Sequence, residues 1–295
     1  TQASQVTQEC ETGAVGDNGM LGAGCVDLTD FHRSALLIGL KEEQTTGYNP
    51  IKLGVIASTD THVSNPGNVK ESDWAGSVVG EGTPVERLQK GILTSGIDGN
   101  PGGLAGIWAE QNTRDSIFNA LLRKEVFGTS GPRIRPRFFA GWNINENLCN
   151  VNEMIADAYA SGVPMGGDLM PSRTKRFPKF LMQAAKDPEG LNIESIQLVK
   201  GWIDEEGNMN TKVIPVLSEI GGAESLCKVY TDTEFENSLP SYYYMRVVEP
   251  ESPRWHTYDC ERLSEDDRPD VCTNETYPSF IREMAWTSPI WYRPE

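Results

Sequence analysis

The sequence predicts an α/β first half followed by a β-rich second half. Up to about residue 130, strand-like apolar runs, polar loops and amphipathic helical stretches alternate, as in an α/β fold. Beyond that point, apolar or alternating runs are separated by Pro, Gly and Asp turns, which is typical of antiparallel strands. The change places a boundary near residues 141–163, and we therefore expect two regions, 1–150 and 151–295.

The first half opens with a Gly-rich, aperiodic arm over residues 1–24. Thr29 or Asp30 can cap a helix that runs to about Gln44. The short apolar run at 52–58 is bounded by turn formers, and it predicts a strand buried on both faces in a parallel sheet.

Two helices and a second strand complete the first half. Pro84 stands at the first turn of a helix expected over 84–93, and a strand is expected over 104–109. Residues 113–125 predict an amphipathic helix. Its buried side is expected to carry Ile117, Phe118, Leu121 and Leu122.

The second half is expected to consist of antiparallel strands with one helix at 152–160. The strands are predicted at 133–140, 177–184, 195–203, 212–217 and 242–248.

Composition excludes several classes of protein. The 295 residues carry 26 basic against 42 acidic side chains, a formal charge of −16. This charge repels a phosphate backbone, so nucleic-acid binding is disfavoured. The longest apolar runs fall well short of the roughly 20 residues that a membrane-spanning helix needs, so no membrane span is expected.

The six cysteines favour structural disulfides, because no C-x-x-C pair supports a zinc ribbon or a thioredoxin-type motif. Cys10 with Cys25, and Cys260 with Cys272, bracket short polar segments, which leaves Cys149 with Cys227; the sequence does not choose among the possible pairings. Disulfides and acidity indicate a periplasmic or secreted protein. The alternative is six unpaired buried thiols in a cytosolic enzyme.

The chain has only three histidines, His32, His62 and His256, and one of them lies beside a carboxylate in the motif Asp60-Thr61-His62. This motif directly follows the expected strand at 52–58, and active sites lie at that end of parallel strands. In extended chain both side chains point the same way and can reach one metal ion, with zinc, manganese or iron as suitable partners. The alternative is a structural His held by a nearby Asp.

Residues 129–133 form a turn whose small side chains leave backbone N–H groups open to an anion. Arg133 could add a bidentate contact to phosphate, sulfate or carboxylate. Glu110 is a second candidate for a catalytic role, although it also stands where the helix at 113–125 begins.

Several ordered motifs resemble the C-terminal half of a bacterial family known as domain-of-unknown-function family 3604. The resemblance rests on Leu53–His62, Gly102–Glu110, Thr129–Ile134, Pro164–Asp168, Lys186–Pro188, Ile196–Trp202 and Ala285–Trp291. That family is similar to the PHP (polymerase and histidinol phosphatase) superfamily, whose distorted (β/α) barrel binds two or three divalent metals for hydrolysis. The resemblance therefore implies the C-terminal part of a PHP-like barrel, followed by a β-rich region.

The resemblance also implies a divided metal site. Asp60 and His62 match the last metal-binding motif of the PHP barrel, whereas its H-x-H pair has no counterpart in this chain. The remaining ligands are then expected in an N-terminal half of the same precursor. One Asp and one His fall short of the three protein ligands of a catalytic zinc, so this chain alone is expected to bind metal weakly.

The expected function is metal-dependent hydrolysis of an ester-like substrate. Asp60 and His62 would be metal ligands, Arg133 and Glu110 catalytic residues, and a small anionic molecule, by analogy a phosphoester, the substrate. The alternative is an exported binding or cell-surface assembly module that keeps the fold without chemistry.

Overall fold

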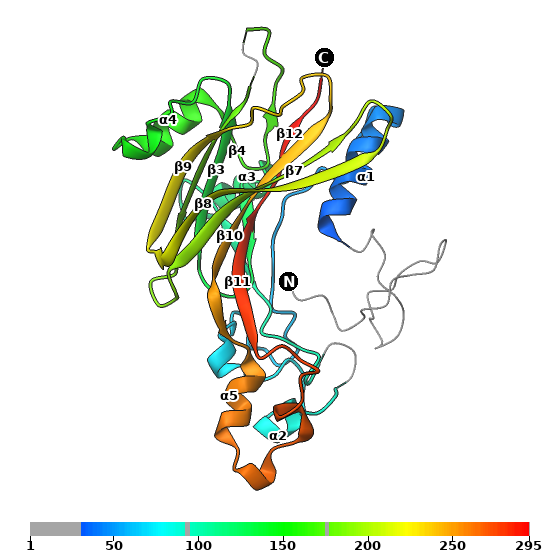
Figure 1. Cartoon of the computed structure of the whole chain (residues 1–295), viewed down its shortest axis with the longest axis vertical. Helices are drawn as coiled ribbons and strands as arrows, with labels where there is room; N and C mark the ends of the chain where they lie inside the picture. The colour runs from blue at the N-terminus through cyan, green and yellow to red at the C-terminus, as the bar shows by residue number, and fades with distance from the viewer. Residues whose placement is uncertain (1–30, 92–94, 175–176, 295) are drawn as a thin grey trace.

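Two antiparallel sheets packed face to face form most of the molecule in the computed structural model, which describes residues 31–91, 95–174 and 177–294 (Figure 1). The larger sheet has eight strands: β1 Leu104–Ile107, β2 Val126–Thr129, β5 Asp168–Leu169, β7 Ile193–Ile203, β8 Met209–Ala223, β10 Ser241–Pro253, β11 Phe280–Thr287 and β12 Ile290–Tyr292. The smaller sheet has four: β3 Arg135–Gly141, β4 Val163–Pro164, β6 Lys179–Ala185 and β9 Ser225–Thr231.

The main core lies between the two sheets. In β10, Tyr243 and Met245 point into it, whereas Tyr242 and Tyr244 point to the other face, as the two-residue period of a strand requires. The smaller sheet alternates in the same way, with Phe138 inside and Phe139 outside. Both faces of these strands are buried, which explains why their sequences are continuous apolar runs.

One helical layer covers the outer face of each sheet. The helix α1 His32–Thr46 buries Leu36, Leu37 and Leu40 against the larger sheet. The outer face of the smaller sheet is covered by η3 Leu148–Asn150 and α4 Met154–Ser161.

A small helical lobe extends from one end of the sandwich (Figure 1). It contains η2 Glu71–Asp73, α2 Pro84–Arg87, α5 Trp255–Arg262, η4 Glu265–Asp267 and η5 Asp270–Cys272. Trp74 and Trp255 pack together in its core, and the buried side chains of Arg87 and Asp259 form a two-point ion pair at 2.8 and 3.0 Å. This lobe has few apolar residues, so the buried ion pair and a disulfide supplement its core.

The predicted fold class is wrong, because the described residues contain no closed barrel and the strands are almost all antiparallel. In the first half, β1 and β2 form an antiparallel pair instead of belonging to a parallel sheet. The five predicted second-half strands are present. However, β8 and β10 extend to Ala223 and Pro253 instead of ending at 217 and 248, and β9, β11 and β12 were not predicted. The two-region division at residue 150 stays a prediction.

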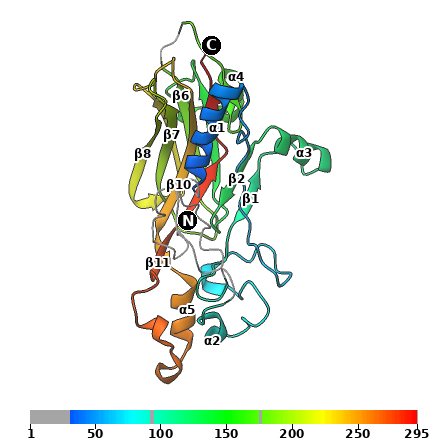
Figure 2. The same cartoon turned by 90° about the vertical axis from the view of Figure 1, so that its right-hand side faces the viewer.

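Two apolar surfaces that were predicted to be buried are exposed. Residues 52–58 form no strand, and Leu53 and Ile56 are 62% and 59% exposed. The helix α3 Arg114–Leu122 projects away from the sandwich (Figure 2), leaving Phe118 and Leu122 57% and 63% exposed and Leu121 exposed as well. The apolar pattern was identified correctly, but within the described chain nothing covers it.

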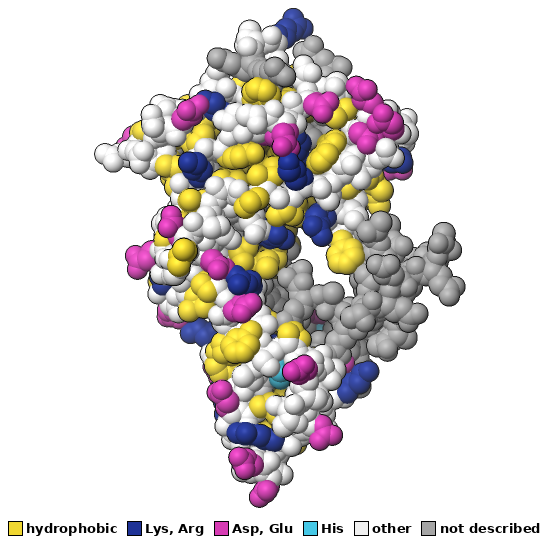
Figure 3. Space-filling model, viewed as in Figure 1, with side chains coloured by type: hydrophobic (Ala, Val, Ile, Leu, Met, Phe, Trp, Pro, Cys, Tyr) yellow, Lys and Arg dark blue, Asp and Glu magenta, His cyan; other side chains and the backbone are white. Residues whose placement is uncertain are grey.

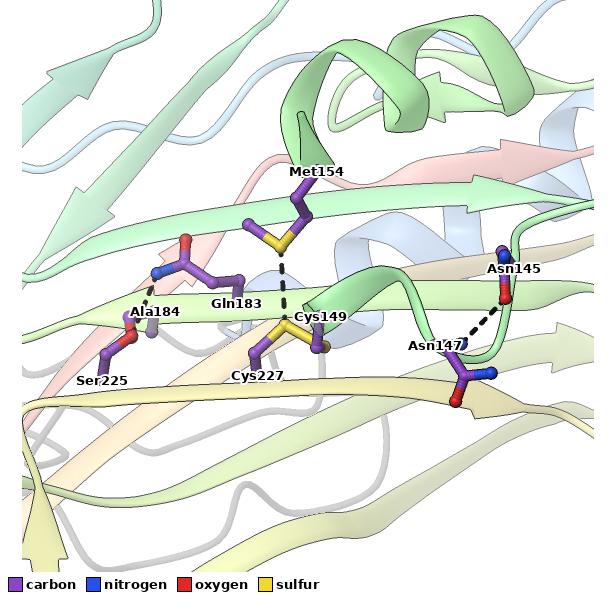
Figure 4. Close-up of a disulfide and its surroundings, with 8 residues drawn as sticks. All are labelled: Asn145, Asn147, Cys149, Met154, Gln183, Ala184, Ser225 and Cys227. Atoms are coloured by element: carbon purple, nitrogen blue, oxygen red, sulfur yellow. Dashed lines mark hydrogen bonds between the residues drawn. A yellow bond between two sulfur atoms is a disulfide. The ribbon is translucent and has the colours of Figure 1, made fainter. Parts of the chain in front are cut away.

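Two of the predicted disulfides are confirmed. Cys149 and Cys227 join η3 to β9, with the Cys227 sulfur 3.7 Å from the sulfur of Met154 (Figure 4), and Cys260 and Cys272 join α5 to η5 in the lobe. Cys10 and Cys25 lie outside the described residues.

The charge is spread over the surface. On the face seen in Figure 3, acidic side chains lie scattered around the edge, and hydrophobic ones gather over the middle. Across the described ranges, no helix has the length and apolar character needed to cross a membrane.

Candidate functional site

A cavity of about 550 Å³ lies where the lobe joins the larger sheet. Its polar side is formed by Glu71 of η2, Ser130 after β2, Arg254 before α5 and Glu283 of β11. Met284 and Trp286 contribute to an apolar wall. A cavity of this size, mostly apolar and with a few convergent polar groups, suits a small-molecule ligand.

Two glycines allow the chain to close one wall of this cavity. Gly102 has a φ of +74°, and a Cβ there would lie 2.6 Å from the carbonyl oxygen of Ser58. Gly103 donates its N–H to the same oxygen at 2.9 Å, and a Cβ there would lie only 1.9 Å from the carbonyl oxygen of Thr129. The segment at 57–59 can therefore pass directly over the β1–β2 pair.

We expect Gly103→Ala to lower the free energy of unfolding by about 2 kcal/mol, because the added methyl group must push two backbone segments apart. Gly82→Ala is the matched control, since its Cβ would meet only the Glu86 carboxylate at 3.8 Å. Urea denaturation measures both. Equal loss of stability in the two variants would show that the close approach at Gly103 has no special cost.

Glu283 is the most enclosed carboxyl group of the cavity wall. It is 6% exposed, and its Oε2 accepts a hydrogen bond from the Ser130 hydroxyl. Burial raises the pKa of Glu283 to about 7, although the bond from Ser130 acts in the opposite direction.

Glu71 stands opposite, at the lobe side. Its Oε2 accepts a hydrogen bond from the Trp255 N–H at 2.5 Å, which fixes the start of α5. Burial and the nearby Glu283 raise the pKa of Glu71 to about 8, while the Trp255 N–H and Arg254 act against this rise. Both carboxyl groups are therefore held substantially protonated at neutral pH.

Glu249 of β10 is a third buried carboxyl group, next to Glu283. It is 1% exposed, and its Oε1 has no hydrogen-bond partner in the parts of the chain that the structure describes. Burial, Glu283 and Asp187 raise the pKa of Glu249 to about 8, and Lys186 offsets only part of this.

The turn at 129–133 is already occupied by a carboxylate of the chain itself. The Arg133 N–H donates to Asp187 Oδ2 at 2.7 Å, and the Glu189 N–H donates to Asp187 Oδ1 at 3.0 Å. Burial works to raise the pKa of Asp187, but these two N–H groups together with the charges of Arg133 and Lys70 outweigh it, and the pKa is lowered. The Arg133 N–H is thus unavailable to an external anion, while the Arg133 side chain is exposed.

Arg254 contributes positive charge to the cavity wall, but most of its donors are engaged. Its Nη2 donates to the carbonyl oxygens of Ile97 and Gly99, both at 2.8 Å, and Nη1 lies 3.1 Å from Nδ1 of His256. Burial and the Arg254 charge lower the pKa of His256 to about 4. His256 is therefore neutral at physiological pH, and its Nδ1 faces the guanidinium of Arg254.

Asp60 and His62 are exposed and lie close in sequence to the cavity wall, since Ser58 forms part of that wall. Asp60 has a φ of 51°, and the His62 N–H donates to the Ser77 carbonyl oxygen at 2.7 Å. Their donor atoms suit a divalent metal. However, no group of three or more His, Cys, Asp or Glu residues that could hold a metal occurs among the residues that the structure describes.

The other predicted site residues lie apart from the cavity wall. Glu110 is exposed between β1 and α3, and Arg133 is exposed three residues after Ser130; neither lines the cavity. Asp168, in one of the family motifs, pairs with Lys52 at 2.5 Å. Glu71, Glu249 and Glu283 were missed, because each is an isolated Glu in the sequence and only the tertiary fold brings them together.

The model of a protein family, described as "Protein of unknown function (DUF3604)", matches residues 22–219 and 216–294. The chain belongs to the DUF3604 family. Searches of curated proteins and of solved structures found no match. In this DUF3604 protein, the matched ranges include Asp60, His62 and every described residue of the cavity wall.

Proposed function

We propose that this DUF3604 chain forms one side of a PHP-like metal-dependent hydrolase site that acts on an ester-like substrate, with a phosphoester as the default. The observation that carries the proposal is the exposed pair Asp60 and His62. The pair comes shortly after Ser58 in the sequence, and Ser58 lines a cavity large enough for a small ligand. The remaining ligands would come from an N-terminal half of the same precursor, because this chain supplies only two.

Each residue has a separate part in the proposal. Asp60 and His62 would hold zinc, manganese or iron, in a cluster of two or three ions in the intact protein, and such ions activate water and polarise the ester. The cavity would orient the substrate body. The exposed Arg133 side chain would neutralise developing negative charge on the substrate, and Glu110 would assist proton transfer.

Localisation forms part of the same proposal. The two disulfides are of the kind that persists in oxidising compartments, which supports a periplasmic or secreted protein.

A second candidate is an exported, non-catalytic binding or cell-surface assembly module. The observation that favours it is the exposed apolar surface of α3 and residues 53–56, since surfaces of this kind mark interaction sites. Under this proposal, the surface would bind a protein partner, and substitution of Asp60 would not change that binding.

Metal content and ester hydrolysis distinguish these functions. In the protein that includes its N-terminal region, Asp60→Ala and His62→Ala should each reduce bound zinc or manganese and lower phosphoesterase activity at least 100-fold. Asp266→Ala, an exposed acidic position in the lobe, is the control and should change neither. Residues 1–295 alone should bind these metals more weakly than micromolar. Unchanged metal content in both site variants would contradict the hydrolase and leave the binding module.

A further inference from the structure

We propose that Glu81 is a positioning residue for His62: its buried carboxylate fixes the loop whose Ser77 carbonyl group holds the His62 backbone. The role of His62 as a metal ligand rests on the proposed function, whereas its placement by Glu81 does not depend on metal or hydrolysis.

The segment around His62 has a strained backbone. Asp60 and Ser64 have φ angles of +51° and +56°, in the left-handed region that residues other than Gly rarely adopt. Such a conformation persists only where the surrounding structure enforces it. The His62 side chain is exposed, so its packing does not supply the constraint. The shape of this segment therefore depends on its backbone contacts.

One hydrogen bond ties this segment to a distant part of the chain. The His62 N–H donates to the Ser77 carbonyl oxygen at 2.7 Å. Across 31–91, 95–174 and 177–294, the other hydrogen bonds of residues 60–64 are local: the Thr61 and Val63 N–H groups donate to threonine hydroxyls two positions earlier, at 3.4 and 3.5 Å. The position of the Ser77 carbonyl group therefore sets the position of the His62 backbone.

Glu81 fixes the peptide unit that carries this carbonyl group. Glu81 is 5% exposed, and its Oε2 accepts hydrogen bonds from the N–H groups of Ser77 at 2.6 Å and Val78 at 3.2 Å. The Val78 N–H and the Ser77 carbonyl group belong to one planar trans peptide unit and point in opposite directions. Glu81 thus holds one side of this unit, and His62 is bonded to the other.

The Glu81 carboxylate is itself held in place by the lobe. Its Oε1 accepts a hydrogen bond from the Gly96 N–H, so three backbone N–H groups bond to one buried carboxylate. Such charge-assisted bonds are stronger than bonds between neutral groups. Arg87 Nη1 donates to the Glu81 carbonyl oxygen at 3.0 Å, and Arg87 is fixed by its ion pair with Asp259. The lobe therefore supports the loop that holds His62.

Amide hydrogen exchange of the His62 N–H, read by NMR on residues 1–295, tests this role. We expect exchange to be about tenfold faster in Glu81→Ala, because loss of the carboxylate frees the Ser77 carbonyl group. Glu86→Ala is the matched control and should leave His62 exchange unchanged. Glu86 also accepts a backbone N–H, from Thr83 at 2.8 Å, but it is exposed and its hydrogen bonds do not involve Ser77.

Two further readings separate positioning from a loss of folding. Exchange in β10, in the middle of the larger sheet, should be equal in all variants. If Glu81→Ala does not fold, Glu81→Gln replaces it, since one amide oxygen cannot accept all three N–H groups, and exchange of the Val78 N–H reports whether its bond is lost. Slow His62 exchange in a folded variant whose Val78 N–H exchanges fast would overturn the positioning role. So would His62 exchange that rises only together with exchange in β10.

Metal binding tests the consequence for the proposed site. In the protein that includes its N-terminal region, Glu81→Ala should weaken zinc binding about tenfold, because contacts that orient a metal ligand strengthen its binding. Glu86→Ala should leave zinc binding unchanged. Faster His62 exchange without zinc binding in any form of the protein would reject the proposed function and keep the positioning role. Zinc binding that needs Asp60 and His62 but not Glu81 would reject the positioning role and keep the metal site.

Discussion

Raising the pH from 6.5 to 9 should lower the melting temperature of this protein by several degrees, because three buried carboxyl groups must ionise. The pKa values of Glu71 and Glu249 are raised to about 8, and that of Glu283 to about 7, from 4.5. In this window the folded state holds protons that the unfolded state has released, so stability falls as pH rises through the folded pKa values. For Glu283 the full effect is about 3 kcal/mol, but most of it accumulates between pH 4.5 and 7, and only about 1 kcal/mol falls above pH 6.5.

The other groups with shifted pKa values titrate outside the range from pH 6.5 to pH 9. The lowered pKa of His256 makes stability rise with pH, but only up to its unfolded value of 6.5. The lowered pKa of Asp187 acts near and below 3.8, and the raised pKa values of the buried tyrosines act above 10. The slope between pH 6.5 and 9 therefore reports the carboxyl groups.

Glutamine substitutions test the assignment. Glu249→Gln and Glu283→Gln should each flatten the decline in melting temperature, measured by differential scanning calorimetry at steps of half a pH unit. Glu251→Gln, which removes an exposed and paired carboxylate, should keep the slope of the unmodified protein. A melting temperature that is constant or rises over this range would contradict the assignment.

Removing the disulfide between Cys149 and Cys227 should have the largest effect on stability of any change considered. The two residues are 78 positions apart, and closing a loop of that size lowers the entropy of the unfolded chain by an amount worth about 4.5 kcal/mol. The bond also holds η3 against β9. Without it, η3 is no longer covalently attached to the smaller sheet, where it helps to cover Phe139 and Leu181.

The lobe disulfide is the natural comparison. Cys260 and Cys272 are 12 positions apart, for which the same relation gives about 3 kcal/mol. Urea denaturation of the double alanine variants Cys149→Ala/Cys227→Ala and Cys260→Ala/Cys272→Ala measures both. A larger loss from the lobe pair would show that loop length does not govern the ranking.

The antiparallel strands were predictable because their pattern is local. In β6, Phe180 and Met182 face one core and Leu181 the other, so an apolar run bounded by turn residues is enough to identify the strand. The run does not encode which strand pairs with it or in which direction that strand runs. A strand buried on both faces has the same composition in a parallel and an antiparallel sheet, and the wrong fold class followed from that ambiguity.

The error at residues 52–58 has a related cause. Leu53 and Ile56 have the composition of a buried strand, but burial depends on a neighbour that local sequence does not specify. The same holds for Phe118 and Leu122 on α3.

The candidate site divides in the same way. Asp60 and His62 could be proposed from the sequence because they are two residues apart, which keeps their backbones close in any fold. Glu71 and Glu283 act on each other only because the fold places η2 and β11 around one cavity, and no spacing rule connects them. The raised pKa values come from burial, which is a property of the folded chain.

The place of β11 in the larger sheet has a consequence for biosynthesis. This strand, Phe280–Thr287, lies between β2 and β10, so an interior position of the sheet is filled by a segment that is translated long after β1 and β2. In the described chain, β11 is the strand through which the β1–β2 pair joins the rest of the larger sheet. The β1–β2 pair therefore has no place in the larger sheet until β11 has been translated.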